Sequence, residues 1–458
     1  MKRIRAVRFV SVLMVPVLFV AACSQRDDDD AGTGGGNSGG GGGGDSTIDT
    51  ADCGIDPTTE IEGDTIKLVS SFPQSGVTAA FSEIANGWKS YFEMVNDEGG
   101  VKIGDKSFQL AWEDKDDEYD ATKTAANIQE LLGTNTENAF AAFSVVGTSN
   151  NIAIRNDMGD DCVPDIFAAT GSPAWGNPDY PWLIGSTLPP YSLESYVFAE
   201  LLKDQKPDAK VAMLIQNDDF GAGYQDSFEK AIEGTDIELV KVESYPPGAT
   251  SDVSAQVTSL AGSGADVFFD GATLIPCPDA LTKATQAGWE REITWVSGTC
   301  ISKTLMGLAG ENAAGVYSIS NIKDPLNPDF ADDEAMQLYR EKVGQYSPDA
   351  DVENGIVAYG WTQAAVFVEA LKQADAPTRL AVMESVRSLD VGDDVGLLSS
   401  GTGVTTDGEA DPYMGERFDL VQYDFQGPDA QNHFTVVQDY DYEGQTADLT
   451  PEALVTGG

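Results

Sequence analysis

The chain has 458 residues and a formal net charge of −48, from 75 acidic and 27 basic residues. Such a charge repels any polyanion, so it excludes nucleic acid as a partner. A chain of this length also exceeds what one hydrophobic core can fill, and it therefore favours two lobes.

The first element is a predicted export signal over residues 1–22. Basic residues precede an apolar run from Phe9 to Val20, and two alanines follow it, as in a secretory signal peptide. The run contains Pro16 and is shorter than the roughly 20 apolar residues that a membrane-spanning helix needs. The stretch "VAAC" resembles the lipobox of bacterial lipoproteins, which implies cleavage after residue 22 and a lipid anchor on Cys23.

A flexible tether is predicted over residues 23–50. Four consecutive aspartates and a glycine-rich stretch occur there, and neither buries apolar surface. The aspartates have no spacing that favours a metal site, and consecutive acids are typical of a solvated spacer. We therefore expect a leash that lets the folded part move above a membrane.

The cysteine count predicts two disulfides in an exported protein. With Cys23 acylated, the cysteines that remain are Cys53, Cys162, Cys277 and Cys300. Four cysteines allow three different pairings. We favour Cys277 with Cys300, because the first follows one predicted strand and the second ends the next. That choice pairs Cys53 with Cys162.

From residue 64 the chain alternates β-rich apolar runs with segments of helical spacing. The predicted strands are residues 65–72, 108–114, 139–147, 165–172, 210–218, 237–245, 266–273 and 292–299. Helical spacing appears in 79–96 and 120–132. This cadence is typical of parallel sheets with right-handed crossovers, which is an α/β fold.

The predicted strands fall into two blocks, separated by a proline-rich stretch at residues 177–192. Three predicted helices follow, at residues 332–343, 354–373 and 378–389, and then two predicted strands, at residues 416–425 and 433–441. These late elements indicate that both lobes are completed by C-terminal segments, so that the chain crosses the hinge three times. Lobe 1 would comprise residues 64–186 with about 319–390, and lobe 2 residues 187–318 with about 391–450.

Six stretches in order carry a family resemblance over residues 64 to 445. They are "IKLVSSFPQSG", "YFEMVNDEGGV", "VVGTSNN", "FAATGSP", "NDDFGAGYQDSF" and "GWEREITWVSGTC". The chain resembles the type I solute-binding proteins of ABC transporters, specifically the branched-chain amino-acid-binding (Leu/Ile/Val-binding) group. The resemblance implies the two-lobed type I periplasmic-binding-protein fold, with a parallel sheet flanked by helices in each lobe.

In open parallel sheets the ligand lies beyond the carboxyl ends of the strands, so the loops there hold the candidate site. Candidate residues are Ser71, Gln74, Ser75, Thr148, Ser149, Asn150, Ala169, Thr170, Trp175, Phe220, Asp270 and Thr273. The "GTSN" loop precedes a predicted helix, whose free N–H groups suit a carboxylate. The resemblance implies the same role for this loop and for Ala169 and Thr170, whereas each could also be an ordinary turn or helix cap.

Two departures from the family pattern concern the ligand. Phe220 stands where family members usually have tyrosine, and Thr299 and Cys300 stand where members that bind an α-ammonium have an acid. Asp270 or the acids at 218 and 219 could replace that acid, or could be caps. The ligand is therefore expected to be a branched-chain or other amino acid, an amide or another carboxylate-bearing compound.

Enzymatic chemistry is not expected, and neither a cofactor nor a metal site is predicted. The only histidine, His433, has no nucleophile motif beside it. The acidic stretch at 113–120 lacks the glycine and closing glutamate of an EF-hand and is interpreted as a strand-to-helix loop.

The sequence thus predicts a monomeric receptor, lipid-anchored to the outer face of a bacterial cell membrane. It would capture a small solute between its lobes and deliver it to ABC permease subunits. The alternative is a sensory lipoprotein that reports the ligand to a signalling partner.

Overall fold

The computed structural model of the chain describes residues 48–134, 139–248, 252–408 and 410–456. The predictions for the export signal, for Cys23 and for most of the tether concern residues outside these ranges.

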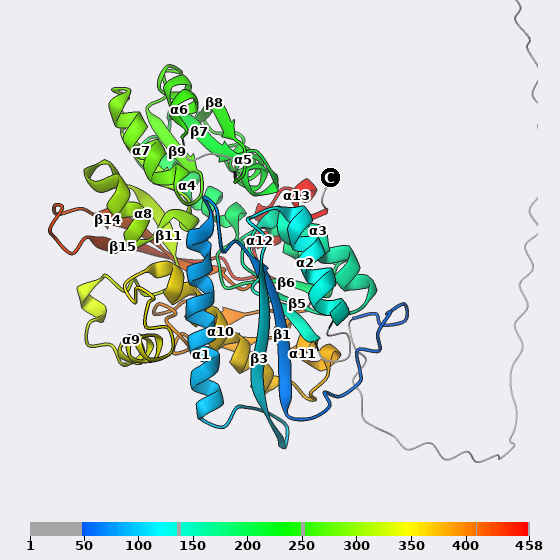
Figure 1. Cartoon of the computed structure of the whole chain (residues 1–458). Helices are drawn as coiled ribbons and strands as arrows, with labels where there is room; N and C mark the ends of the chain where they lie inside the picture. Colours follow the sequence, from blue (N-terminus) through cyan, green and yellow to red (C-terminus); the bar gives the residue numbers. More distant parts are fainter. Residues whose placement is uncertain (1–47, 135–138, 249–251, 409, 457–458) are drawn as a thin grey trace, which may run out of the picture. The chain divides into compact units, whose positions relative to one another are not determined.

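The first sheet has six strands in the order β2-β3-β1-β4-β5-β6. Figure 1 labels four of them, β1, β3, β5 and β6. They are β1 (Thr65–Phe72), β2 (Val101–Ile103), β3 (Lys106–Asp116), β4 (Ala139–Phe143), β5 (Asp165–Ala168) and β6 (Leu183–Gly185). All neighbours are parallel except β2 and β3, which form a tight antiparallel hairpin at the edge. The helices between them are α1 (Glu83–Asp97), α2 (Ala121–Thr134) and α3 (Thr148–Asp160).

The second sheet has seven strands in the order β15-β14-β11-β10-β9-β7-β8. They are β7 (Lys210–Gln216), β8 (Glu238–Tyr245), β9 (Val267–Gly271), β10 (Ile293–Val296), β11 (Tyr317–Ser320), β14 (Arg417–Asp424) and β15 (His433–Asp441). Its helices are α4 (Tyr191–Gln205), α5 (Asp219–Ala231), α6 (Ser254–Ala261), α7 (Pro276–Gln286) and α8 (Lys303–Ala309). The two last strands join antiparallel, so this sheet is parallel only from β8 to β11.

All eight strands predicted for the two blocks are present, but several end earlier than predicted. The runs predicted to reach residues 147, 172 and 299 end at Phe143, Ala168 and Val296. Directly after β4, Ser144 has a φ of 57°, which leaves the extended conformation although the apolar sequence continues. The residues beyond these strand ends form loops, and those loops line the cavity described below.

The late helices return to the first sheet. These are α9 (Glu334–Tyr346), α10 (Gly355–Gln373) and α11 (Arg379–Val386), and α10 packs along α1 (Figure 1). Glycine is required at this contact, because a Cβ on Gly360 would lie 1.9 Å from the backbone oxygen of Ile84. On the same interface a Cβ on Gly87 would lie 2.1 Å from the oxygen of Val357. The two helix backbones therefore approach each other more closely than larger residues allow.

The chain passes between the two sheets three times. The first connection follows β6, the second follows β11, and the third leads through the short pair β12 (Asp390–Val391) and β13 (Val404–Thr405) to β14. The lobe boundaries given above remain a proposal.

Both predicted disulfides are present. Cys53 is bonded to Cys162, with 5.3 Å between the Cα atoms, and Cys277 is bonded to Cys300, with 6.2 Å between them. The second bond joins the beginning of α7 to the short helical turn after β10, so it links the segments that follow the neighbouring strands β9 and β10.

Candidate functional site

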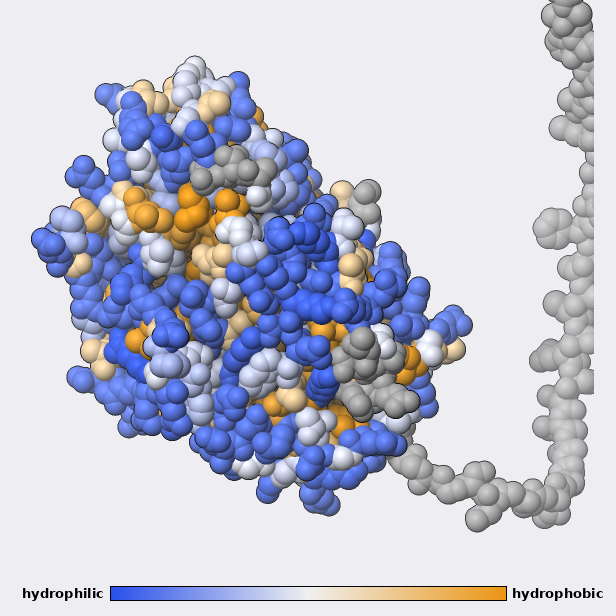
Figure 2. Space-filling view, in the orientation of Figure 1, coloured by the Kyte–Doolittle hydropathy of each residue, from blue (hydrophilic) through white to orange (hydrophobic). Residues whose placement is uncertain are grey.

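A cavity of about 130 Å³ lies where loops from both sheets meet. Its wall includes Val146 and Thr170, which follow β4 and β5, and Thr273 and Thr299, which follow β9 and β10. Hydrophobic surface gathers near α8 and the beginning of α1 (Figure 2), from which Lys303 and other lining residues come. The cavity therefore occupies the position where open α/β sheets bind ligands.

Most of the lining is aliphatic or aromatic. Examples from different elements are Phe81, Ile84, Phe220, Ile301, Ile356 and Phe434. Removing an apolar molecule from water against such walls is favourable by about 25 cal/mol for each Å² buried. Shape and apolar contact, rather than charge, thus dominate what this cavity can hold.

The charged side chains of the lining are already paired or titrate abnormally. Lys303 contacts Asp351 and Glu353 at 3.0 and 2.6 Å, and Lys323 contacts Asp333 at 2.8 Å. Burial raises the pKa of Asp419 to about 6. A ligand carboxylate would therefore depend on hydroxyl and backbone N–H groups more than on a free cation.

A cluster of three hydroxyl groups lies at the carboxyl ends of β4 and β5. The Oγ1 atoms of Thr148 and Thr170 are 2.7 Å apart, and Thr170 Oγ1 is 3.1 Å from the hydroxyl of Tyr191. Thr170, Tyr191 and Ala169 line the cavity, while Thr148 begins α3 directly after the lining residue Gly147. The structure thus brings together the two loops for which a carboxylate-binding role was predicted.

The next two residues of α3 make other contacts and do not line this cavity. Ser149 Oγ donates to Oδ2 of Asp219 at 2.6 Å, and Asp219 begins α5 of the second sheet. Asn150 Nδ2 donates to Oγ1 of Thr124 at 2.7 Å. Ser149 therefore joins the elements of the two sheets outside the cavity.

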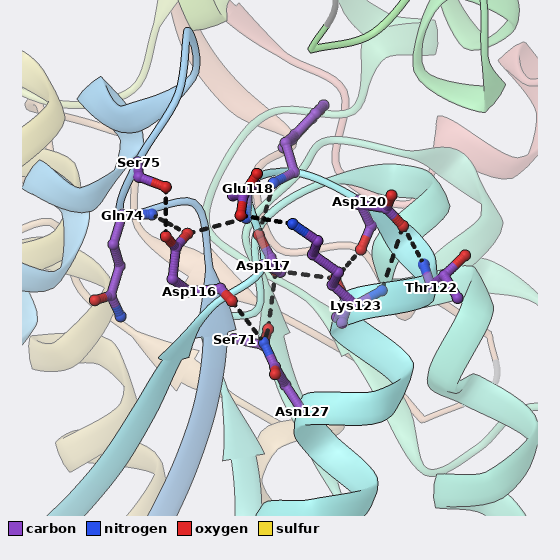
Figure 3. A network of polar contacts seen from close by, with 12 residues as sticks. Ser71, Gln74, Ser75, Asp116, Asp117, Glu118, Asp120, Thr122, Lys123 and Asn127 are labelled. Carbon is purple, nitrogen blue, oxygen red and sulfur yellow. Dashed lines mark hydrogen bonds and ion pairs between the residues drawn. The ribbon is translucent and has the colours of Figure 1, made fainter.

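The three candidates at the end of β1 and in the loop after it contact acidic residues at the end of β3 and directly after it; Figure 3 shows Ser71, Gln74 and Ser75 beside Asp116 and Asp117. Ser71 Oγ donates to Asp117 at 2.9 Å, Gln74 Nε2 donates to Asp114 at 2.8 Å, and Ser75 Oγ donates to Asp116 at 2.5 Å. These side chains are not part of the cavity wall. They hold the acidic stretch in place. The prediction of a strand-to-helix loop over 113–120 is correct only for residues 117–120, because β3 continues to Asp116.

The four remaining candidates are divided between the wall and its support. Phe220 and Thr273 line the cavity, and the buried Oγ1 of Thr273 has no hydrogen-bond partner among the described residues. Trp175 lies behind the wall, where its Nε1 donates to the carbonyl of Thr170 at 3.0 Å. Asp270 is fully buried outside the lining, and burial raises its pKa well above the ordinary value.

Sequence reasoning missed Glu194, which is 1% exposed and lines the cavity from the first turn of α4. Its carboxylate accepts hydrogen bonds from Trp295 Nε1 at 2.8 Å and from the backbone N–H of Gly298 at 3.0 Å. Burial raises its pKa to about 7, which the hydrogen bonds from Trp295 and Tyr224 oppose. The signal in the sequence was a single acid among the apolar residues Tyr191, Leu193, Val197 and Phe198.

Sequence comparison places the chain among known binding proteins. The family model described as "Periplasmic binding protein" matches residues 65–428. The Leu/Ile/Val-binding protein homolog 7 of Brucella suis biovar 1 is 23% identical over 361 residues, which cover 75% of this chain and 85% of that protein.

Solved structures show the same fold. A branched-chain amino acid ABC transporter protein from Thermus thermophilus with bound valine has a TM-score of 0.70 at 15% identity, covering 82% of this chain and 97% of that one. A fatty acid ABC transporter substrate-binding protein from Thermomonospora curvata has a TM-score of 0.69 at 18% identity, covering 87% and 98%. With its two sheets, its cavity between them and a family match over most of its length, this chain belongs to the periplasmic binding protein family.

Proposed function

We propose that this chain is the solute receptor of an ABC importer and that its ligand is a small, mainly apolar molecule with one polar head. As a periplasmic binding protein it acts outside the cytoplasm. The observation that carries the ligand class is the wall of the cavity, in which apolar side chains from both sheets outnumber polar ones. A ligand that contacts both sheets at once favours the closed arrangement over the open one.

The polar head would meet hydroxyl groups rather than a free charge. Thr170 and Tyr191 lie at one part of the wall, and the unpartnered Oγ1 of Thr273 lies at another. An unmade hydrogen bond at a buried hydroxyl costs about 1–3 kcal/mol, so a ligand group that satisfies it adds affinity. Branched-chain amino acids, fatty acids and their amides all combine an apolar body with such a head.

Two similar proteins support this range of ligands. The Thermus thermophilus protein holds valine, and the Thermomonospora curvata protein is named for fatty acids. The present chain has Phe220 in its cavity wall, and a phenyl ring there adds apolar surface without a hydroxyl. This residue favours the more apolar of the two ligand types.

The sequence of the leader supports a lipid anchor at Cys23 and delivery to permease subunits in the same membrane. Two or three acyl chains hold a protein on a bilayer, whereas one chain alone binds reversibly. The described part of the chain contains no helix long and apolar enough to cross a membrane. We further propose that the protein acts as a monomer and binds its ligand without converting it.

A sensory role was the alternative, and the comparisons do not favour it. The similar proteins named above are binding proteins of amino acids or are assigned by name to ABC transporters.

The test is identification of the ligand. Native mass spectrometry of the protein purified without its leader would reveal a co-purified molecule. A thermal-shift panel would then compare L-leucine, L-valine, 4-methylpentanoate, 4-methylpentanamide, hexanoate and a hydrophilic control such as L-glutamate. We expect the apolar compounds to raise the unfolding temperature and glutamate to leave it unchanged; stabilisation by glutamate alone would contradict the proposed ligand class.

A further inference from the structure

A chain of hydrogen bonds connects the buried Glu194 to a second point on the cavity wall. Oε2 of Glu194 lies 2.7 Å from the hydroxyl of Tyr224, on α5. That hydroxyl lies 2.7 Å from Oγ of Ser297, and Oγ of Ser297 lies 2.9 Å from Oγ1 of Thr299. Glu194 and Thr299 line the cavity, whereas Tyr224 and Ser297 are fully buried between them.

The number of hydroxyl hydrogens in this row of hydrogen bonds determines which group donates and which accepts in each bond. Each of the three hydroxyl groups has one hydrogen to donate. Ionised Glu194 only accepts, so Tyr224 donates to it, Ser297 donates to Tyr224, and Thr299 donates to Ser297. The backbone N–H of Thr299 also points to Ser297 Oγ, at 3.2 Å. The Thr299 hydroxyl is then left with lone pairs for the cavity and no hydrogen.

We propose that Glu194 determines ligand specificity by acting through Tyr224 and Ser297, so that Thr299 selects an N–H or O–H donor on the polar head of the ligand. Thr299 contacts the ligand, and Glu194 is the positioning residue. The proposal rests on the proposed function, because it concerns the ligand of the same cavity. It assigns to a residue on α4 the control of a hydroxyl that the sequence alone presents as neutral toward donors and acceptors.

Burial keeps the direction of these hydrogen bonds fixed, because buried groups cannot exchange their partners for water. The other contacts of the carboxylate, from Trp295 Nε1 and Gly298 N–H, are both donors and hold its Oε1 as an acceptor. Oε2 is consequently the only carboxyl oxygen that points to a group able to either donate or accept. When Oε2 of Glu194 is protonated, it donates to Tyr224, and donor and acceptor change places in every hydrogen bond from there to Thr299.

The pKa of Glu194, raised to about 7 by burial, places this reversal within an accessible pH range. The titratable groups beside the carboxyl are Tyr191 on its own helix and Tyr224 on α5, and burial raises the pKa of both. The hydrogen bonds that oppose the shift come from neutral groups on β10 and its following turn and on α5. The charged side chains elsewhere on the cavity wall are Lys303, Lys323, Asp324 and Asp419.

The experiment compares two probes that differ by one donor. 4-Methylpentan-1-ol has an O–H group, and its methyl ether offers only an acceptor on the same apolar body. Isothermal titration at pH 8 would give the affinity ratio of alcohol to ether for the wild type and for E194Q. In E194Q the side-chain amide donates to Tyr224. The direction of every hydrogen bond in the row is then reversed, so the Thr299 hydroxyl donates to the ligand in the cavity.

We expect the wild type to prefer the alcohol by roughly fivefold or more, since the ether leaves the Thr299 acceptor buried and unpaired. In E194Q the ratio should fall toward one, because both probes accept. In the wild type the ratio should also fall between pH 8 and pH 6, while it should stay constant in E194Q. A purely structural Glu194 would produce no such pH profile.

Two further variants complete the test. Y224F interrupts the chain while leaving Glu194 in place and should also lower the ratio, which keeps the proposal testable if E194Q does not fold. S195A is the matched control, because Ser195 is buried on the same helix and, within the described ranges, its Oγ donates only to the backbone oxygen of Tyr224, at 3.2 Å. It should leave the ratio unchanged.

The outcomes separate the two proposals. Binding of both probes with an unchanged ratio in E194Q and Y224F would overturn the role of Glu194 alone. Failure of the alcohol to bind while 4-methylpentanoate binds would do the same, because an ionised carboxylate head has no hydrogen to donate. If no apolar compound bound the wild type, the proposed function would fall and this inference with it.

Discussion

The contact between Ser149 and Asp219 separates two explanations of the same residue. The sequence predicts that Ser149 binds a ligand carboxylate, whereas the structure shows its hydroxyl 2.6 Å from Asp219 Oδ2 on α5. A hydrogen bond to a charged acceptor contributes about 1.5–3 kcal/mol, and Asp219 is exposed, so we take about 1 kcal/mol here. Through RT this corresponds to about a fivefold effect on any equilibrium in which the contact forms.

The assay is a double-mutant cycle of S149A and D219A. Urea unfolding without ligand should show that each single variant is less stable and that the double variant loses less than the sum, with a coupling of about 1 kcal/mol. S388A is the matched control, because the Ser388 hydroxyl donates to the backbone oxygen of Glu384 and to no other residue that the structure describes. The coupling should weaken in high salt, because the pair is accessible to solvent.

Affinity for a ligand from the panel completes the comparison. If Ser149 acts by holding the two sheets together, S149A and D219A should weaken binding to the same extent, by about fivefold, and the double variant should be no worse. If Ser149 contacts the ligand, S149A should weaken binding and D219A should not. Additive losses in unfolding, together with an effect of S149A alone on binding, would refute the reasoning from the structure.

Three other predictions concern stability and anchoring. Asp165 is fully buried, neither of its carboxyl oxygens has a hydrogen-bond partner in the described part of the chain, and burial raises its pKa from 3.8 to about 7. The contribution of Asp165 to the free energy of unfolding is complete below pH 3.8 and is lost as the pH rises through 7. The free energy of unfolding of D165N should therefore rise relative to that of the wild type by up to about 4 kcal/mol between pH 4 and pH 8. Parallel urea-unfolding profiles of the two proteins would argue against this. G360A should lower the free energy of unfolding by about 1–3 kcal/mol, because its Cβ meets Ile84. G344A has open space around it and should raise the free energy of unfolding by up to about 1 kcal/mol. Thermal unfolding of both variants measures the difference. C23S should move the protein from the detergent phase to the aqueous phase on phase partitioning, and unchanged partitioning would exclude Cys23 as the anchor.

The elements of this fold were accessible from local sequence because their signals are local. Short apolar runs separated by helical spacing gave all eight strands of the two blocks, and the late helices and strands were likewise placed within a few residues. The pairing of Cys277 with Cys300 followed from the same pattern, because neighbouring strands in a parallel sheet bring their following loops together. Composition and periodicity are sufficient to predict a helix or strand where the conformation depends on the residues of that segment alone.

The ends of the strands were less accessible, and they matter most for the site. Apolar sequence continues past β4, yet Ser144 turns the chain away from the sheet. The edge hairpin of β2 was not predicted, because a three-residue strand has too little pattern to detect. In both cases the deciding interactions are made with neighbouring elements rather than within the segment.

For the site, the sequence by itself determined which loops lie at the carboxyl ends of the strands and hence that Ala169, Thr170, Phe220 and Thr273 reach the cavity wall. Only the tertiary structure decided that Ser149 turns to another helix, since its partner is 70 residues away. It also decided that Glu194 is linked to a row of hydroxyl groups, because Glu194 precedes β7 in the sequence whereas Ser297 follows β10. Side-chain direction and hydrogen-bond polarity depend on partners that only folding brings together, and the ligand is selected by those two properties.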